Sequence, residues 1–363
     1  MTAVRDRLPT VDFIRGLCII LVVVHHLNLR IRFNKSALGA ALPDVINRFL
    51  FWTGSYSVKV FFVVSGFLIT STILRRWGTL DRIDIRAFYR LRFARIAPCL
   101  LALLPVLSAL HLAGVTGFTI NPTRTSLARA LFAALTFHVN WLEIKVGYLP
   151  GSWDILWSLA VEETFYLFYP VVCRLVTRWW MLASMAAGLV VAGPFFRTVL
   201  APNEMATDYA LFANLDCIAM GCVAAVLAGR LRLPGLATRI AGWTLIVLVT
   251  VARPIVAKLH LYPTGLDVTV LALGAALVLM TLGNGGTPSR WTTPIRWYGR
   301  NSYEIYLTHM FAVMFGFQAF TALHMPLDAA PMWFAVVLGV SGLLGHLVAT
   351  FFSEPMNRWL RQA

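Results

Sequence analysis

The sequence predicts an all-α membrane protein, a polytopic bundle of about ten transmembrane helices. Of its 363 residues, 59% are hydrophobic and only 13% are charged, whereas a soluble globular chain carries about 25% charged residues. The mean hydropathy is +0.73, and apolar segments of about 20 residues, the length that crosses a bilayer, recur along the whole chain. These observations exclude an ordinary soluble enzyme. We expect residues 1–363 to form a single membrane domain.

Ten of the apolar segments predict membrane-crossing helices. They cover about 11–30, 55–74, 94–114, 155–176, 180–200, 208–229, 240–257, 265–283, 301–323 and 332–352. An eleventh segment, 127–142, is short and contains polar His138 and Asn140. We therefore predict that 113–154 is one external stretch, with a re-entrant or interfacial piece near 127–142. An even number of spans places both termini on one side.

The basic residues set the predicted orientation. The net charge of +15 could indicate nucleic-acid binding, but cytoplasmic loops of membrane proteins are rich in Lys and Arg, which explains the charge better. With both termini in the cytoplasm, the predicted inner loops hold most of the arginines, including the dense run in 75–95. We expect no nucleic-acid partner. The five cysteines show no paired metal-binding spacing, so no metal is expected.

The first span carries Arg15, His25 and His26 within an apolar stretch. Arg15 and His26 are eleven residues apart, about 1100° of helical rotation and about 16 Å of rise, so they lie within roughly 20° of one face. His25 lies about 80° away from Arg15. One stripe thus combines a fixed cation with a titratable imidazole. The alternative is that Arg15 extends to the interface while the histidines hydrogen-bond inside the bundle.

The fifth span contains Ser158, Glu162 and Tyr166, which recur every four residues and so share a face, directly after Trp157. We expect Glu162 at a depth comparable to that of His26. A carboxylate beside an imidazole can orient and charge a general base. An ion pair that joins two helices is the alternative reading.

Three further spans carry polar groups. In the second span, Ser65-Gly66 alone would be read as a packing notch of small residues. Arg92 and Arg95 share a face at the inner mouth of the third span, and arginine suits bidentate phosphate contacts or anionic lipid headgroups. The tenth span carries a stripe of Ser302, Tyr306 and His309, which faces the bundle interior or a cavity.

Together these residues resemble the acyltransferase 3 family of membrane acyltransferases. The matching features, in chain order, are Arg15 with His26 at R-x10-H spacing, Phe61–Leu68 with Ser65-Gly66, Arg92-x-x-Arg95-Ile-x-Pro98, Trp157-Ser158 before Glu162 and Phe165-Tyr166, Ser302-Tyr303 before Tyr306-Leu307 and His309, and Glu354-Pro355. Any one of them is weak, but the whole series covers nearly the entire chain. Some members carry a further C-terminal extracytoplasmic hydrolase-like domain, and we expect none here.

The resemblance implies ten spans and transfer of an acyl group from cytosolic acyl-coenzyme A to an extracytoplasmic hydroxyl, commonly on a carbohydrate. We therefore expect an O-acyltransferase, most simply an O-acetyltransferase, in a bacterial cytoplasmic membrane, with acyl-coenzyme A as co-substrate and no tightly bound cofactor. The expected roles are catalytic for His26, Glu162 and Arg15, donor binding for Arg92, Arg95, Ser65 and Gly66, and substrate binding for Trp157, Ser158, Tyr166, Tyr306 and His309.

Several alternatives remain open from the sequence. A multi-span transporter or flippase for an envelope precursor would also place charges within the membrane. A non-catalytic scaffold would need Arg15 and His26 only for stability. A covalent acyl-enzyme on Ser65, Ser158 or His26 is a further possibility. The acceptor, the acyl group and the oligomeric state are not determined by the sequence.

Overall fold

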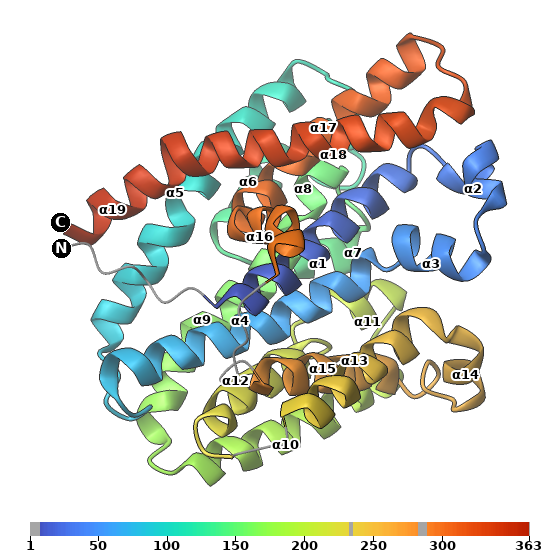
Figure 1. The fold of residues 1–363 in the computed structure, drawn as a ribbon. Helices are drawn as coiled ribbons and strands as arrows, with labels where there is room; N and C mark the ends of the chain where they lie inside the picture. Colours follow the sequence, from blue (N-terminus) through green and yellow to red (C-terminus); the bar gives the residue numbers. More distant parts are fainter. Residues whose placement is uncertain (1–7, 232–234, 282–288, 363) are drawn as a thin grey trace.

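The computed structural model describes residues 8–231, 235–281 and 289–362, and every regular element in these ranges is a helix (Figure 1). The helices are α1 (Pro9–Asn28), α2 (Ala37–Ala41), α3 (Asp44–Trp52), α4 (Gly54–Trp77), α5 (Ile85–Leu112), α6 (Leu127–Leu135), α7 (Val139–Val146), α8 (Gly151–Asp154), α9 (Leu156–Leu175), α10 (Trp179–Phe195), α11 (Glu204–Tyr209), α12 (Leu215–Ala228), α13 (Gly235–Val251), α14 (Arg253–Lys258), α15 (Leu266–Met280), α16 (Thr293–Arg300), α17 (Ser302–Ala322), α18 (Ala330–Val348) and α19 (Glu354–Gln362). A π-helical turn, Ala349–Ser353, joins α18 to α19.

The long helices confirm the predicted polytopic membrane bundle. Within the described residues, seven helical segments are long and apolar enough to cross a membrane, and three shorter apolar helices accompany them, namely α12, α13 and α15. These ten elements correspond in order to the ten predicted spans. The number that crosses the bilayer and the side on which each end lies remain predictions. The predicted cytoplasmic termini, 1–7 and 363, lie outside the described residues.

The short apolar segment 127–142 is divided between two helices, α6 with nine residues and α7 with eight. A nine-residue helix rises only about 14 Å, less than half of the roughly 30 Å hydrocarbon core. Phe137, in the turn between them, has a positive φ of 55°, so the chain changes direction there. Neither helix can span the bilayer, in agreement with the expectation for this segment. Its re-entrant or interfacial position remains a prediction.

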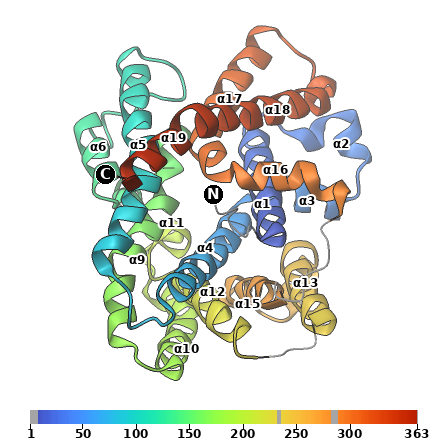
Figure 2. The same ribbon diagram turned by 60° about the vertical axis from the view of Figure 1, so that its left-hand side comes forward.

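Two outer groups of helices enclose a central pair. Figure 2 shows α17, α18 and α19 on one side of α1 and α4, and α10, α12, α13 and α15 on the other. Helix α12 packs closely on α4, α17 on α18, and α13 on α15. At the α4–α12 contact, Gly66 lies against the backbone of Ile218, and Gly221 lies against the backbone of Val63. Because a Cβ at either glycine would collide with that backbone, small residues are required there.

Candidate active site

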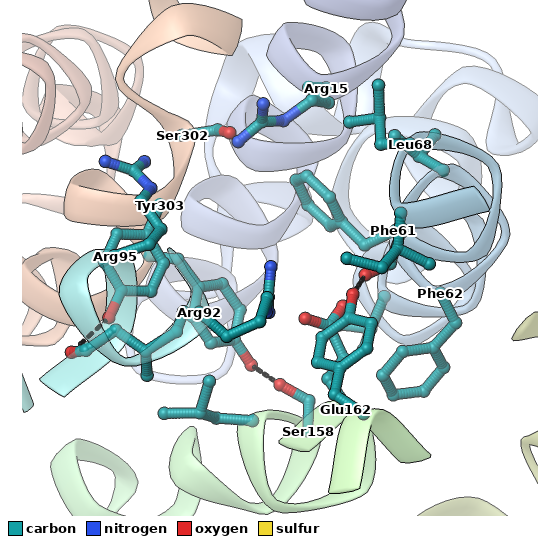
Figure 3. Close-up of a pocket in the computed structure, with 18 of the residues that line it drawn as sticks. Arg15, Phe61, Phe62, Leu68, Arg92, Arg95, Ser158, Glu162, Ser302 and Tyr303 are labelled. Carbon is teal, nitrogen blue, oxygen red and sulfur yellow. Dashed lines mark hydrogen bonds between the residues drawn. The ribbon is translucent and has the colours of Figure 1, made fainter. Parts of the chain in front are cut away.

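A cavity of about 250 Å³ opens between α1, α4, α5, α9 and α17. Helix α1 contributes Arg15, α5 contributes Arg92 and Arg95, and α9 contributes Ser158 and Glu162 (Figure 3). The remaining lining residues are Val58, Phe61, Phe62, Val64, Ser65, Leu68, Ile69, Thr72, Ile96, Leu159, Tyr166, Ser302, Tyr303, Tyr306 and Leu307. A mostly apolar wall with a few convergent polar groups is typical of a small-molecule site.

The polar stripe predicted on α9 faces this cavity. Ser158, Glu162 and Tyr166 all line it, which confirms that the three share a face. The hydroxyls of Ser158 and Tyr306 are 2.6 Å apart, and the Tyr306 hydroxyl also donates to the carbonyl oxygen of Ile155 at 3.0 Å. The Tyr166 hydroxyl bonds to that of Ser65 on α4. These bonds fix two tyrosines across helix boundaries, so the wall of the cavity is preorganised.

Arg92 and Arg95 both line the cavity, as their shared face predicted, and each is paired with a buried carboxylate. Arg92 donates to Glu163 at 2.8 Å and stacks over the ring of Tyr166, with 3.8 Å between the guanidinium carbon and the ring centroid. Arg95 donates to Glu304 at 2.8 Å. Each arginine side chain retains exposure, 21% for Arg92 and 27% for Arg95. Part of each planar fork therefore remains available to a ligand.

Arg15 differs from these two arginines. It lines the cavity, and within the described part of the chain its guanidinium forms no hydrogen bond or ion pair. Figure 3 shows it entering the cavity beside Ser302. A cation at membrane depth is costly unless it meets a partner. Asp12, Glu304 and Glu162 act on Arg15 electrostatically, but no described carboxylate contacts its guanidinium directly, so its N–H groups remain suited to an anionic group or a developing negative charge.

His26 lies beyond the cavity wall, next to a second histidine. Nδ1 of His26 is 3.2 Å from Nε2 of His309 on α17, and the ring of His309 lies 5.8 Å from that of Tyr306. His25 turns the other way, with its Nδ1 donating to the carbonyl oxygen of Phe51 at 2.9 Å. The two histidines therefore face different neighbours, as their different angles around the helix predicted.

The structure separates some residues that the sequence reading grouped. Glu162 faces the cavity, and among the described contacts it forms none with His26, whose side-chain partners are Val22 and His309. Gly66 lies on the far side of α4, against α12, which matches the packing alternative. Ser65, its neighbour, faces the cavity.

Trp157 also lies outside the cavity lining. Its ring stacks on Tyr209 with centroids 4.2 Å apart and contacts Phe62, which does line the cavity. The Tyr209 hydroxyl donates to Asp154 at 2.8 Å. Nearby, Glu143 of α7 is fully buried and accepts a hydrogen bond from the Leu149 amide at 2.9 Å. Burial, followed by the charge of Asp154, raises the pKa of Glu143 well above its ordinary value.

Sequence reasoning missed two residues that shape the site, Glu163 and Glu304. Glu163 directly follows Glu162 and so lies about 100° away from it around the helix, and Glu304 lies within the tenth predicted span. One signal could have found both of them. A carboxylate inside a membrane span requires a partner, and the arginines of the third span were the obvious candidates.

The chain matches the model of the acyltransferase 3 family, described as an Acyltransferase domain, over residues 8–351. It is 27% identical over 339 residues to the peptidoglycan O-acetyltransferase OatA of Listeria monocytogenes, covering 84% of this chain and 49% of that protein. It is 25% identical over 237 residues to the O-acetyltransferase OatA of Staphylococcus aureus, covering 60% of this chain and 34% of that protein. No solved structure matches.

The fold and the cavity define a multi-pass membrane protein with a site lined by three arginines and one glutamate. The family match is more specific, because it extends over nearly the whole chain: this protein belongs to the acyltransferase 3 family. The chain spans about half or less of the length of the curated relatives that it matches.

Proposed function

We propose that this protein is an O-acyltransferase of a bacterial cytoplasmic membrane. In this proposal, an acetyl group moves from cytosolic acetyl-coenzyme A to a hydroxyl of an extracytoplasmic carbohydrate. The observation that carries the proposal is the cavity with its three arginines, one of which, Arg15, forms no hydrogen bond or ion pair within the described chain. The family match and the printed activities of the two OatA relatives support the reaction type.

The donor binds where α5 supplies Arg92 and Arg95. Coenzyme A carries phosphates, and a guanidinium fork suits bidentate phosphate contacts better than an ammonium group does. The ion pairs with Glu163 and Glu304 hold the two arginines in place and leave their remaining N–H groups for the ligand. Ser65 of α4 also lines the cavity and contributes a hydroxyl to the same space.

Arg15 and His26 divide the transfer step between them. Arg15 stabilises the negative charge that develops on the thioester oxygen, an interaction that strengthens as the transition state forms. His26 takes the proton of the acceptor hydroxyl as general base. The new bond forms between the acceptor oxygen and the acyl carbon, the carbon–sulfur bond breaks, and the thiolate of coenzyme A receives the proton. Glu162, on the cavity wall, assists electrostatically.

The acceptor is placed by the outer part of the site. Ser158 and Tyr306 offer hydroxyls on the cavity wall, and Trp157 backs them from outside the lining, whereas Tyr166 stacks on Arg92 and so lies beside the donor. Hydroxyl and aromatic groups suit a sugar, which has polar edges and apolar faces. The acceptor of the Listeria relative is peptidoglycan by its name, and we propose a cell-envelope glycan of this class.

Labelled acetyl-coenzyme A tests the proposal. Purified protein in liposomes receives [¹⁴C]acetyl-coenzyme A and a soluble peptidoglycan fragment, with the His26→Ala protein in parallel. We expect release of coenzyme A and base-labile label on the fragment with the parent protein only. Transport of the fragment across the liposome without release of coenzyme A would contradict acyl transfer and favour a transporter.

A further inference from the structure

Two histidines meet at the outer end of the site. Nε2 of His309 lies 3.2 Å from Nδ1 of His26, and their ring centroids are 5.1 Å apart. His309 is fully buried, with 0% of its surface exposed, whereas His26 keeps part of its surface accessible. Of the two, only His26 has surface that a substrate can contact, and His309 can act on a substrate only through its neighbour.

Backbone carbonyls determine where the hydrogens lie in this pair. Nδ1 of His309 is 2.7 Å from the carbonyl oxygen of Tyr306, and Nδ1 of His26 is 3.0 Å from that of Val22. A carbonyl oxygen only accepts, so in each neutral ring Nδ1 carries the hydrogen and Nε2 carries the lone pair. The assignment rests on the hydrogen-bond partners.

The two assignments agree with each other. The lone pair on Nε2 of His309 faces the hydrogen on Nδ1 of His26, which is thus shared between His309 and Val22. Nε2 of His26 retains its own lone pair. This is the tautomer that a general base needs when its second nitrogen is held by a buried partner.

We propose that His309 is a positioning residue, which fixes the tautomer and orientation of His26 so that Nε2 of His26 accepts the proton of the acceptor hydroxyl. The inference rests on the proposed function and replaces the substrate-binding role that the sequence suggested for His309. Once His26 takes the proton, its Nδ1–H belongs to a cation, and its hydrogen bond to His309 becomes charge-assisted and stronger. The contact therefore favours the charged transition state over the resting state, which is the condition for an effect on kcat.

Two amide substitutions at position 309 test this role. In His309→Gln the amide oxygen can replace Nε2 as the acceptor for His26. In His309→Asn the shorter side chain reaches the Tyr306 carbonyl but offers His26 no acceptor. We expect His309→Asn to lose about 10–100-fold in kcat, as for loss of an orienting partner, with KM for acetyl-coenzyme A and for the glycan fragment unchanged. His309→Gln should recover most of the rate.

A matched control completes the test. His346→Asn removes a half-buried imidazole from α18 and should leave kcat unchanged. Equal rates for the Gln and Asn proteins, or a raised KM for the fragment at unchanged kcat, would overturn the positioning role while the proposed function stands. Absence of transfer by the parent protein would reject the proposed function itself.

Discussion

Two buried clusters of charge in this protein are built on opposite principles. The first joins Arg197, in the π-helical turn Phe196–Leu200 that follows α10, to Asp216 of α12. The guanidinium donates to both carboxylate oxygens, at 2.8 and 3.2 Å, and to Thr269 and the carbonyl oxygens of Gly265 and Ala213. Every N–H of the fork has a protein partner, since a guanidinium carries five donors. The Asp216 side chain is 0% exposed.

The second cluster is the cavity, where the charges are left partly unsatisfied. Arg92 and Arg95 each have one carboxylate partner and keep part of their side chains exposed. Arg15 has no hydrogen bond or ion pair within the described part of the chain. The comparison teaches that a buried charge whose bonds are all formed holds helices together, whereas one left open to a cavity is available for a ligand.

The largest effect is expected at His26, beside the open cluster. Loss of a positioned general base typically costs 10²–10⁴-fold in rate. His26→Ala should therefore abolish detectable acyl transfer, measured with labelled acetyl-coenzyme A, while the protein still inserts and accumulates. Glu162→Gln should fall between this variant and the parent, because it keeps the shape and loses the charge.

His25→Ala is the matched control for His26→Ala. His25 faces Phe51 and Trp52 rather than His309, so substantial activity should remain. An inactive His25→Ala protein together with an active His26→Ala protein would show that His25, not His26, is the general base.

A smaller effect is expected at Arg95, whose guanidinium pairs with one carboxylate and remains partly exposed. Removing its charge should weaken donor binding with the fold intact, so Arg95→Ala should raise KM for acetyl-coenzyme A. Arg95→Lys should restore binding only in part, because lysine lacks the planar fork. Steady-state kinetics at a fixed glycan concentration measure both variants. An unchanged KM for the donor in Arg95→Ala would remove Arg95 from phosphate binding.

The smallest effect concerns stability and lies outside both clusters, at Glu143 of α7. Its pKa is raised by burial in the folded protein, so the folded state binds the proton more tightly than the unfolded state does. The resulting stabilisation is full below the ordinary carboxyl pKa of about 4.3 and is lost as the pH rises. Glu143→Gln, which imitates the protonated form, should match the parent in thermal stability near pH 4 and exceed it at pH 8.

Thermal unfolding in detergent at the two pH values measures the Glu143 prediction, with exposed Glu204→Gln as the control. The control should follow the parent at both values. A Glu143→Gln protein that is less stable than the parent at pH 8 would show that the ionised carboxylate is the stabilising form.

Helical spacing predicted which residues share a face, and hence much of the site. Ser158, Glu162 and Tyr166 line the cavity together, as do Arg92 and Arg95. Which residues share a face of one helix follows from the fixed rotation per residue, so it can be predicted from that helix alone. The apolar segments likewise predicted the bundle, because the length of a span follows from the thickness of the bilayer.

The pairings between helices could not be predicted in this way. Glu304 meets Arg95, and His309 meets His26, across large distances in sequence. Such contacts depend on how far each helix is rotated about its axis, which is decided by packing at places such as the Gly66 contact with α12. For the same reason, Glu162 could not be assigned to one partner from the sequence.

Arg15→Met and Arg197→Met, measured side by side, test the central claim most directly. Both substitutions replace a guanidinium inside the helix bundle by an unbranched apolar side chain. Breaking a satisfied buried pair costs about 3–5 kcal/mol, so Arg197→Met should fail to accumulate as folded protein by size-exclusion chromatography. Arg15→Met should accumulate like the parent and lose about 10²–10³-fold in kcat, as for loss of an oxyanion donor. An Arg15→Met protein that accumulates poorly, but whose folded fraction transfers acetyl groups at the parent's rate, would contradict the account.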